Sequence, residues 1–346
     1  MPTPSMNDTS WATDYGRRPD LEAIETNPPI GFIGERIYPR ANQRNIAGTI
    51  TGLSLPQYAA AVTNRTDGNA PSTNLILNTD ASFSCTEICA RFGKTARDVQ
   101  AAGSVWASDM QGAIGASYSF NCLLEQKRLT KLVTPIPSTA DNLITPTAGA
   151  KIRSVIYGAL KSLRRYRGKR VLIMGADMLD VFADSFAMKS FYEGIPFERR
   201  DAFKDRRELI VYSMQTVFLL DEILVADDTI LNAAGNASAI GDYLVVAVLP
   251  HENEVTEDSF QTTNIELGRT ITYQPAEGMK PYQIESFPDF DAMVNKYTAI
   301  GMNDIVEFNP MQKRIIDPSN IDFSGGAPVS ITGGTVVTID GGTVSA

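Results

Sequence analysis

The hydrophobic positions between Thr95 and Leu132 follow the period of one long amphipathic helix. Small or apolar residues recur there at alternating spacings of four and three: Val99, Gly103, Trp106, Met110, Ala113, Ser117, Phe120 and Leu124. Such spacing places one face of a helix against a core. A helix of about 35 residues would be roughly 50 Å long, whereas the average globular helix has about a dozen residues. We therefore predict a spine helix, within residues 92–133, that crosses a whole subunit.

The sequence before this helix predicts an arm and a hairpin. Residues 1–45 are polar and interrupted by prolines, which is typical of an extended arm. Residues 46–91 hold β-like stretches on either side of a polar turn that contains Asp67-Gly68, and the last stretch runs directly into the spine helix. Because the flanks of the turn contain few large apolar residues, we expect this extended hairpin loop to project from the subunit.

Residues 134–260 predict a central α/β domain. Thr147 is a candidate N-cap for an amphipathic helix whose apolar face runs from Ile152 to Leu163. Two further helices are expected, at Ala176–Met188 and Glu208–Leu219. Buried strands are expected at Val171–Gly175, Glu222–Val225 and Tyr243–Leu249.

The remaining sequence predicts a β-rich peripheral domain and a repetitive tail, so the fold class is α+β. Residues 261–323 contain a strand pattern at Arg269–Tyr273 and a short helical pattern near Phe290–Tyr297. In residues 324–346, pairs of glycines recur every eight residues, and Thr335–Asp340 alternates as a strand would. Such a tail forms a small meander, adds strands to a neighbouring sheet, or stays disordered.

Composition and charge restrict the class of protein. The chain of 346 residues is 43% apolar and 21% charged, which is enough for a substantial core. It has no run of eighteen apolar residues and no secretory signal at its start, so we expect it to be cytosolic when made. Residues 221–346 carry 19 acidic and 5 basic side chains, a net charge of −14 against −9 for the whole chain. This asymmetry could draw neighbouring subunits together or reflect two ordinary solvated faces, and it argues against a coat of nucleic-acid-binding charge.

Candidate chemistry is sparse. Cys85, Cys89 and Cys122 match no disulfide framework and no metal knuckle, so free thiols are predicted. The single histidine, His251, stands in a polar loop, which favours a surface residue over a catalyst or a zinc ligand. Val171–Asp177 has the strand-glycine-helix shape of a nucleotide fold but lacks its glycine fingerprint. We predict no catalytic residue, no cofactor and no metal, and therefore no enzyme.

The run Arg164–Arg170 has two interpretations. It places cations at the end of the helix that precedes it, where the helix dipole favours positive charge. The alternative is contact with packaged nucleic acid on the inner surface of a shell.

The order of these parts resembles the major capsid proteins of tailed phages, which share the HK97-like fold. Ile33–Pro39 looks like the passage that leads into the extended loop of these proteins, and Arg65–Pro71 is similar to the tip of that loop. Val171–Leu179 resembles the strand-glycine-helix passage of their axial domain, and Phe218–Asp227 resembles a later axial segment. The resemblance covers about residues 30 to 320 and leaves out the glycine-paired tail.

The resemblance implies a structural role. Residues 134–260 would be the axial domain, and many copies of the chain would form hexamers and pentamers of an icosahedral shell. The shell would enclose double-stranded DNA and contact it non-specifically. Scaffolding, portal and decoration proteins would be further partners, and no membrane would be involved. The protein would be made in the bacterial host cytoplasm and end in the virion. The candidate subunit-interface residues are Arg65, Asp67, Gly68, Tyr38 and Pro39.

Two other interpretations remain open at the level of sequence. A tail-tube or sheath subunit would also lack catalytic motifs, but it should be mostly β, which disagrees with the spine helix. An α/β enzyme built around Val171–Leu249 would need a site that none of the recognised motifs provides.

Overall fold

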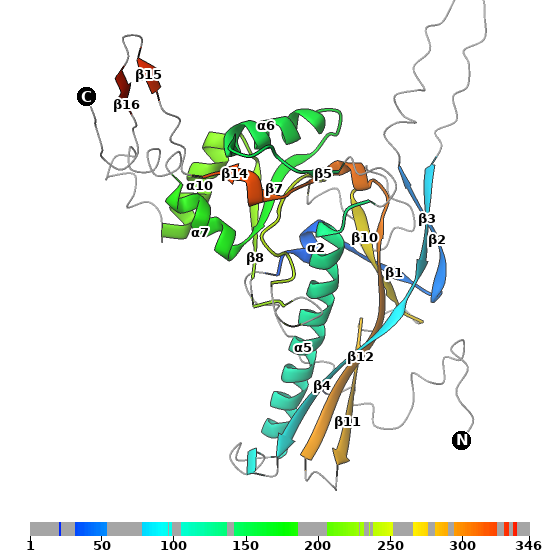
Figure 1. Ribbon diagram of the computed structural model, residues 1–346. Coiled ribbons are helices and arrows are strands. Elements are labelled where there is room, and N and C mark those ends of the chain that lie inside the picture. Colours follow the sequence, from blue (N-terminus) through cyan, green and yellow to red (C-terminus); the bar gives the residue numbers. More distant parts are fainter. Residues whose placement is uncertain are drawn as a thin grey trace, which may run out of the picture. The chain divides into compact units, whose positions relative to one another are not determined.

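The computed structural model describes residues 21, 32–53, 78–95, 97–98, 105–136, 142–185, 206–227, 229–231, 235, 238–251, 266–275, 281–289, 294–323, 329–331 and 335–337. The chain divides into two compact units (Figure 1). Unit 1 comprises Met1–Lys131 and Glu252–Asn309, and unit 2 comprises Leu132–His251 and Pro310–Ala346.

Unit 1 is built on a five-stranded sheet with one very long strand. The path of the sheet runs through β1 (Arg40–Gln43), β10 (Gly268–Tyr273), β12 (Val294–Glu307) and β11 (Gln283–Asp289), and β4 (Thr86–Thr95) also pairs with β12. Within this sheet, β1 pairs parallel with β10, and the other described pairs are antiparallel. Residues 294–300 of β12 pair with β11 and with β4, so these two strands flank β12. The long strand therefore supports the whole sheet.

The long helix α5 (Val105–Val133) packs against this sheet, and the later part of the predicted apolar stripe is confirmed. Val99 and Gly103 of that stripe lie outside the described residues, and Met110 is half-buried. Ala113, Ser117, Phe120 and Leu124 are at most 2% exposed, and Phe120 lies in one core cluster with strand residues of β4, β11 and β12. Burying a side chain of that size stabilises the fold by about 1.5–3 kcal/mol. The side chain of Trp106, in the first turn of α5, lies outside the described residues.

Glycines on α5 let the sheet approach closely. A Cβ atom on Gly112 would lie 2.3 Å from the Tyr297 ring, and one on Gly115 would lie 2.7 Å from the Phe92 ring. Tyr297 completes the contact because its hydroxyl donates to Asp109 Oδ1 at 2.5 Å. Small residues on the helix are thus required by bulky aromatic residues on β12 and β4.

A two-stranded hairpin adjoins the sheet of unit 1. β2 (Ala47–Leu53) pairs antiparallel with β3 (Asn78–Ser84), which confirms the predicted hairpin, and residues 54–77 between them lie outside the described part. β3 continues into β4 after Cys85 alone.

Unit 2 contains the predicted α/β core. Its main sheet has the order β5 (Leu143–Ile144), β13 (Lys313–Ile316), β9 (Leu244–Leu249), β7 (Lys169–Gly175) and β8 (Glu222–Ala226). Every residue of β9 and the last five of β7 are buried, as in a sheet covered on both faces. β7 and β8 are parallel, and α7 (Ala176–Asp184) and α10 (Arg206–Phe218) lie between them in sequence. Phe182 of α7 meets Phe218 of α10 edge to face, with ring centroids 6.0 Å apart.

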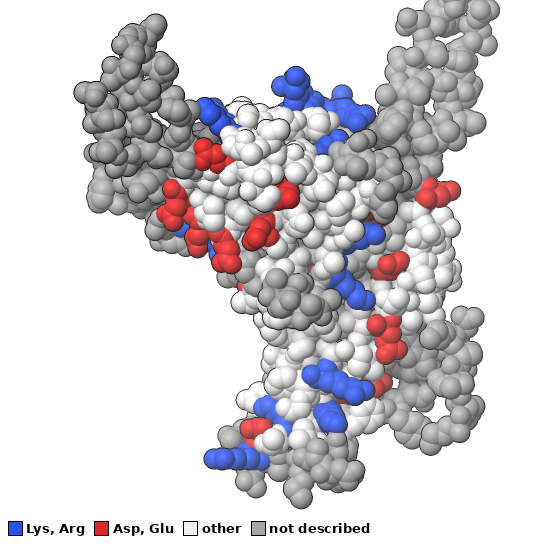
Figure 2. Space-filling model, viewed as in Figure 1, with Lys and Arg blue, Asp and Glu red and all other residues white. Residues whose placement is uncertain are grey.

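The rest of the described part of unit 2 comprises the helix α6, two short 3-10 helices and short strands. α6 (Ile152–Ser162) follows β6 (Ala150–Lys151), and β6 pairs with β14 (Ile321–Asp322). The short helices η3 (Pro310–Gln312) and η4 (Pro318–Asn320) flank β13. In the tail, β15 (Val329–Ile331) pairs with β16 (Thr335–Val337), which confirms a strand at Thr335. Lys and Arg side chains gather along α6, whereas Asp and Glu gather over α7 (Figure 2).

Several predicted boundaries are wrong. The spine helix does not begin near residue 92, because Phe92–Thr95 belong to β4 and pair with β12, and the described helix begins at Val105. The short helix near Phe290–Tyr297 is also wrong, since β12 occupies Val294–Tyr297. Thr147 is not an N-cap, because α6 begins only at Ile152.

The predicted domain limits also differ from the two units. The predicted arm contains β1, and the predicted hairpin and start of the spine contain β4, but both are strands of the main sheet of unit 1. The predicted peripheral domain contains β13, which lies inside the sheet of unit 2, between β5 and β9. In each case a short segment pairs with strands that are distant in sequence.

Candidate assembly site at the hairpin base

The carboxylate of Glu125 holds the end of the arm against α5. The short helix α2 (Gly34–Ile37) begins with backbone N–H groups that have no partner within the helix. Glu125 Oε1 accepts hydrogen bonds from the N–H groups of Ile33 and Gly34, both at 2.8 Å. Burial raises the pKa of Glu125, and the Arg128 charge and these backbone hydrogen bonds oppose that rise. A Cβ atom on Gly34 would lie 2.4 Å from Glu125 Oε2, so only glycine fits this approach.

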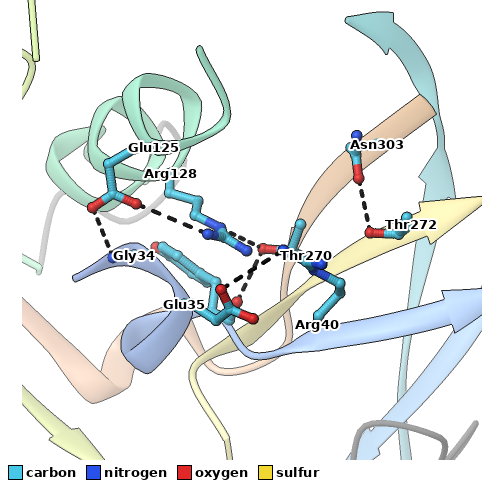
Figure 3. A network of polar contacts seen from close by, with 9 residues as sticks. Gly34, Glu35, Arg40, Glu125, Arg128, Thr270, Thr272 and Asn303 are labelled. Atoms are coloured by element: carbon cyan, nitrogen blue, oxygen red, sulfur yellow. Dashed lines mark hydrogen bonds and ion pairs between the residues drawn. The ribbon is translucent and has the colours of Figure 1, made fainter. Parts of the chain in front are cut away.

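Arg128, one turn further along α5, connects Glu125 to the sheet (Figure 3). Its Nη1 atom lies 3.9 Å from Glu125 Oε2, and its Nε atom donates to Thr270 Oγ1 at 2.9 Å. Thr270 Oγ1 in turn donates to the carbonyl oxygen of Tyr38 at 3.0 Å. Burial lowers the pKa of Arg128 to about 10, so the guanidinium keeps its charge at neutral pH. We call Glu125, Arg128, Thr270 and Tyr38 the anchor network.

Tyr38 and Pro39 lie inside unit 1. The Tyr38 side chain is fully buried, and its hydroxyl donates to Glu307 Oε1 at 2.5 Å. Burial, reinforced by the Glu307 carboxylate, raises the pKa of Tyr38 well above its usual value. Pro39 is buried as well, and its carbonyl oxygen accepts the N–H of Thr270 at 3.0 Å. Contacts within the chain thus account for both residues, and a role between subunits stays a prediction for them.

The base of the hairpin is fixed to the same sheet. Ile50 of β2 and Phe83 of β3 are 2% and 5% exposed, and they share a core cluster with Ile271 of β10. The N–H of Ser84 donates to Asp304 Oδ2 at 2.9 Å, which joins β3 to β12. The hairpin therefore starts from a packed base, although its sequence contains few large apolar residues.

The remaining predicted interface residues cannot be placed. Arg65, Asp67 and Gly68 lie outside the described residues, and their role between subunits stays a prediction. The structure thus joins Tyr38 and Pro39 to the anchor network and leaves the tip of the hairpin untested.

The arrangement suits mechanical support better than chemistry. Its hydrogen bonds run from α5 to the arm and to β10, although Glu125 Oε2 and Arg128 Nη2 are buried without a hydrogen-bond partner within the described ranges. The paired groups of such a buried network hold the elements that carry them in fixed positions. Among the described residues, no group of three or more His, Cys, Asp or Glu side chains could hold a metal ion. Of the three free cysteines, Cys85 is buried, and burial together with the Asp304 carboxylate raises its pKa to about 12. His251 is exposed, as predicted. No helix in the described part of the chain is long and apolar enough to cross a membrane.

The charged members of this site were missed at the level of sequence. Glu125 and Arg128 are 1% and 4% exposed although they flank apolar positions of α5. A second buried pair, Glu266 and Arg269, is bidentate, with N–O distances of 2.7 and 2.8 Å. Helical spacing does not distinguish such buried charges from surface ones, because their partners lie elsewhere in the sequence.

Solved structures identify the fold. No known family profile matches the sequence, and no curated protein matches it. A phage-related protein from Bordetella bronchiseptica RB50 superposes with a TM-score of 0.60 at 11% identity, over 88% of this chain and 98% of that one. The capsid of Ralstonia phage GP4 superposes with a TM-score of 0.50 at 8% identity, over 91% and 97% of the two chains. At these identities the likeness concerns the fold, and it confirms the predicted α+β, HK97-like architecture.

Proposed function

We propose that this chain is the major capsid protein of a tailed phage and that it assembles into an icosahedral shell around double-stranded DNA. The observation that carries the proposal is a fold shared with the capsid of Ralstonia phage GP4 over 91% of the chain. A shared fold by itself does not specify a function, so the physical character of the chain must agree with it.

Unit 1 supports the proposal because its parts are shaped for contacts beyond one subunit. A two-stranded hairpin is marginal as an isolated structure, so β2 and β3 need the packed base that Ile50 and Phe83 provide. Residues 54–77, which connect the two strands in sequence, lie outside the described residues. The extended loop predicted for them would be suited to binding a neighbouring subunit, since a thin shell needs large intersubunit areas.

The shell proposal also names partners and a location. The chain itself is the first partner, in hexamers and pentamers, and packaged double-stranded DNA is the second. Scaffolding, portal and decoration proteins are the further partners, the virion is the location, and the host bacterial cytoplasm is the site of synthesis.

Electron microscopy of the purified chain tests this function. Negative-stain images and size-exclusion chromatography should show closed shells, or rings the size of a capsomer when a scaffolding partner is absent. A monomer that stays monodisperse at every salt concentration, with and without a scaffolding partner, would contradict the proposal.

The alternative classes predict different outcomes in the same experiment. A tail-tube or sheath subunit would form open tubes, and the 29-residue helix α5 argues against such a mostly β protein. An enzyme would remain a small particle, and the capsid fold argues against that class.

A further inference from the structure

Half of the Lys and Arg residues of unit 2 lie in one segment of the sequence that has no acidic residue. Between Asn142 and Ala176 the sequence has eight Lys and Arg residues and no acidic residue, although the whole chain has a net charge of −9. These residues are Lys151, Arg153, Lys161, Arg164, Arg165, Arg167, Lys169 and Arg170. The neighbouring helix α7 carries the opposite charge, with Asp177, Asp180 and Asp184 all exposed.

Most of these cations lie on the outer side of α6 and of the turn that follows it (Figure 2). Arg153, Tyr157 and Lys161 are spaced by four residues, so they form one stripe along the helix. Ile156 and Leu160 face the core instead. We define the basic α6 surface as five exposed residues: Arg153, Lys161, Arg164, Arg165 and Arg167. Within the described residues, none of the five forms an ion pair with a carboxylate.

Two of these arginines lie over aromatic rings. The Arg153 guanidinium lies 5.4 Å from the centre of the Tyr157 ring, and the Tyr157 hydroxyl is fixed by donating to the carbonyl oxygen of Val217 at 2.8 Å. Arg165 lies 5.7 Å from the centre of the Tyr166 ring. Arg153 Nη2 donates to the Tyr157 hydroxyl at 3.4 Å, and the other N–H groups of a stacked guanidinium can still bind phosphate oxygens, whose geometry they match.

Stabilisation of the helix dipole does not explain this surface. A cation favours the C-terminal end of a helix, but Lys151 and Arg153 lie at the N-terminal end of α6, where positive charge is unfavourable. The C-terminal end already has a buried cation, because Arg314 Nε donates to Ser162 Oγ at 3.0 Å. Cations at both ends of one helix, without an acidic residue, indicate an external anion.

We propose that the basic α6 surface binds the phosphate backbone of double-stranded DNA. The eleven residues of α6 span about 16 Å, and duplex DNA carries about one negative charge per 1.7 Å, so about nine phosphate charges can lie along the helix. Binding of this kind reads no base sequence. If the proposed function holds, on which this last step rests, α6 turns toward the interior of the shell.

Two variants of the full chain with equal loss of charge test the site. The first variant carries Arg164→Gln, Arg165→Gln and Arg167→Gln. The matched control carries three exposed substitutions in unit 1: Arg44→Gln, Arg91→Gln and Arg97→Gln. Fluorescence anisotropy of a labelled duplex of about 30 base pairs is measured over a range of salt concentrations. Thermal melting by circular dichroism verifies that both variants are folded.

We expect the α6 variant to bind at least about tenfold more weakly at low salt and its salt slope to fall by about three, one for each phosphate that an arginine no longer neutralises. The control should bind within about twofold of wild type at about 0.1 M salt, because charges more than about 10 Å from the bound phosphates are largely screened at that ionic strength. An α6 variant that binds like wild type, or an equal loss in both variants, would overturn the proposal. So would an α6 variant that fails to assemble but keeps its DNA affinity, since the surface would then bind another subunit.

The two proposals fail in different ways. Shells that form normally while the α6 variant binds DNA like wild type refute the basic α6 surface and leave the capsid function intact. A chain that never assembles but loses DNA affinity through the α6 substitutions refutes the capsid function and supports the binding site.

Discussion

Gly34 shows how one missing side chain allows the arm to dock. Alanine would favour the helical conformation of α2 by about 0.5–1 kcal/mol. Its Cβ atom, however, would lie 2.4 Å from Glu125 Oε2 and 2.5 Å from Arg128 Cδ, and overpacking costs about 1–3 kcal/mol. We therefore expect Gly34→Ala to lower the free energy of unfolding by about 1–2 kcal/mol in urea titrations. Gly158→Ala is the control, because Gly158 has open space around it and should gain about 0.5–1 kcal/mol. Equal stability of the Gly34 variant and wild type would contradict the geometry.

Glu125 should make stability depend on pH in a defined direction. Burial raises the pKa of this carboxyl in the folded state, so the folded state binds the proton more tightly than the unfolded state does. The contribution of Glu125 is therefore most favourable at low pH, and it decreases as the pH rises from the unfolded value through the folded one. Relative to Glu125→Gln, wild type should lose stability across that range, as measured by denaturation at several pH values. A constant difference between the two proteins would contradict this assignment.

Single residues also show where sequence analysis succeeds and fails. Phe120 and Leu124 were predicted to be buried because spacing along one helix reports a shared face. Glu125 and Arg128 could not be predicted, since their partners Gly34 and Thr270 lie 91 and 142 residues away in the sequence. Local periodicity contains no information about such contacts.

At the scale of elements, helices were predicted better than strands, because a helix depends on local spacing and a strand depends on a partner that is distant in sequence. Strand β7 and helices α6, α7 and α10 were recognised from local patterns, and the structure confirms them with small shifts of their ends. The end of β4 and the start of β12 are expected to be helical but form strands, because Phe92 is paired with Tyr297, more than two hundred residues away. A strand forms where a partner strand is available, and that availability depends on the whole fold.

The hairpin provides the prediction at this scale. Its base is stabilised by Ile50 and Phe83, so the described part of unit 1 does not depend on the tip. Deleting Thr66–Ala70 should leave helix content and the melting temperature of the unassembled subunit nearly unchanged. The yield of intact particles should fall, or the particles should become fragile or misshapen. Circular dichroism measures the first effect and particle counts in electron micrographs measure the second. Loss of subunit folding would place the tip in the core instead.

At the scale of the whole molecule, the chain passes between the two units three times, and the last passage supplies an internal strand. β13 follows β12 of unit 1 after only a few residues and enters the sheet of unit 2 between β5 and β9. Its backbone pairs with Leu244–Ala247 on one side and with Leu143–Ile144 on the other. The sheet of unit 2 is therefore completed only when residues 313–316 have been made.

Two truncations test this dependence. A chain that ends at Asn309 lacks β13, which would leave the backbone groups on the β13 side of β9 without partners, and each buried unsatisfied group costs about 1–3 kcal/mol. Because that penalty is repeated along the strand, we expect unit 2 to lose its cooperative thermal transition. A chain that ends at Phe323 keeps β13, β14 and the contact of Phe323 with Phe182, whose ring centroids are 5.5 Å apart. It should melt within a few degrees of wild type, since only the tail is removed. Calorimetry of both chains measures the transitions, and a native-like transition of unit 2 in the chain that ends at Asn309 would show that β13 is dispensable.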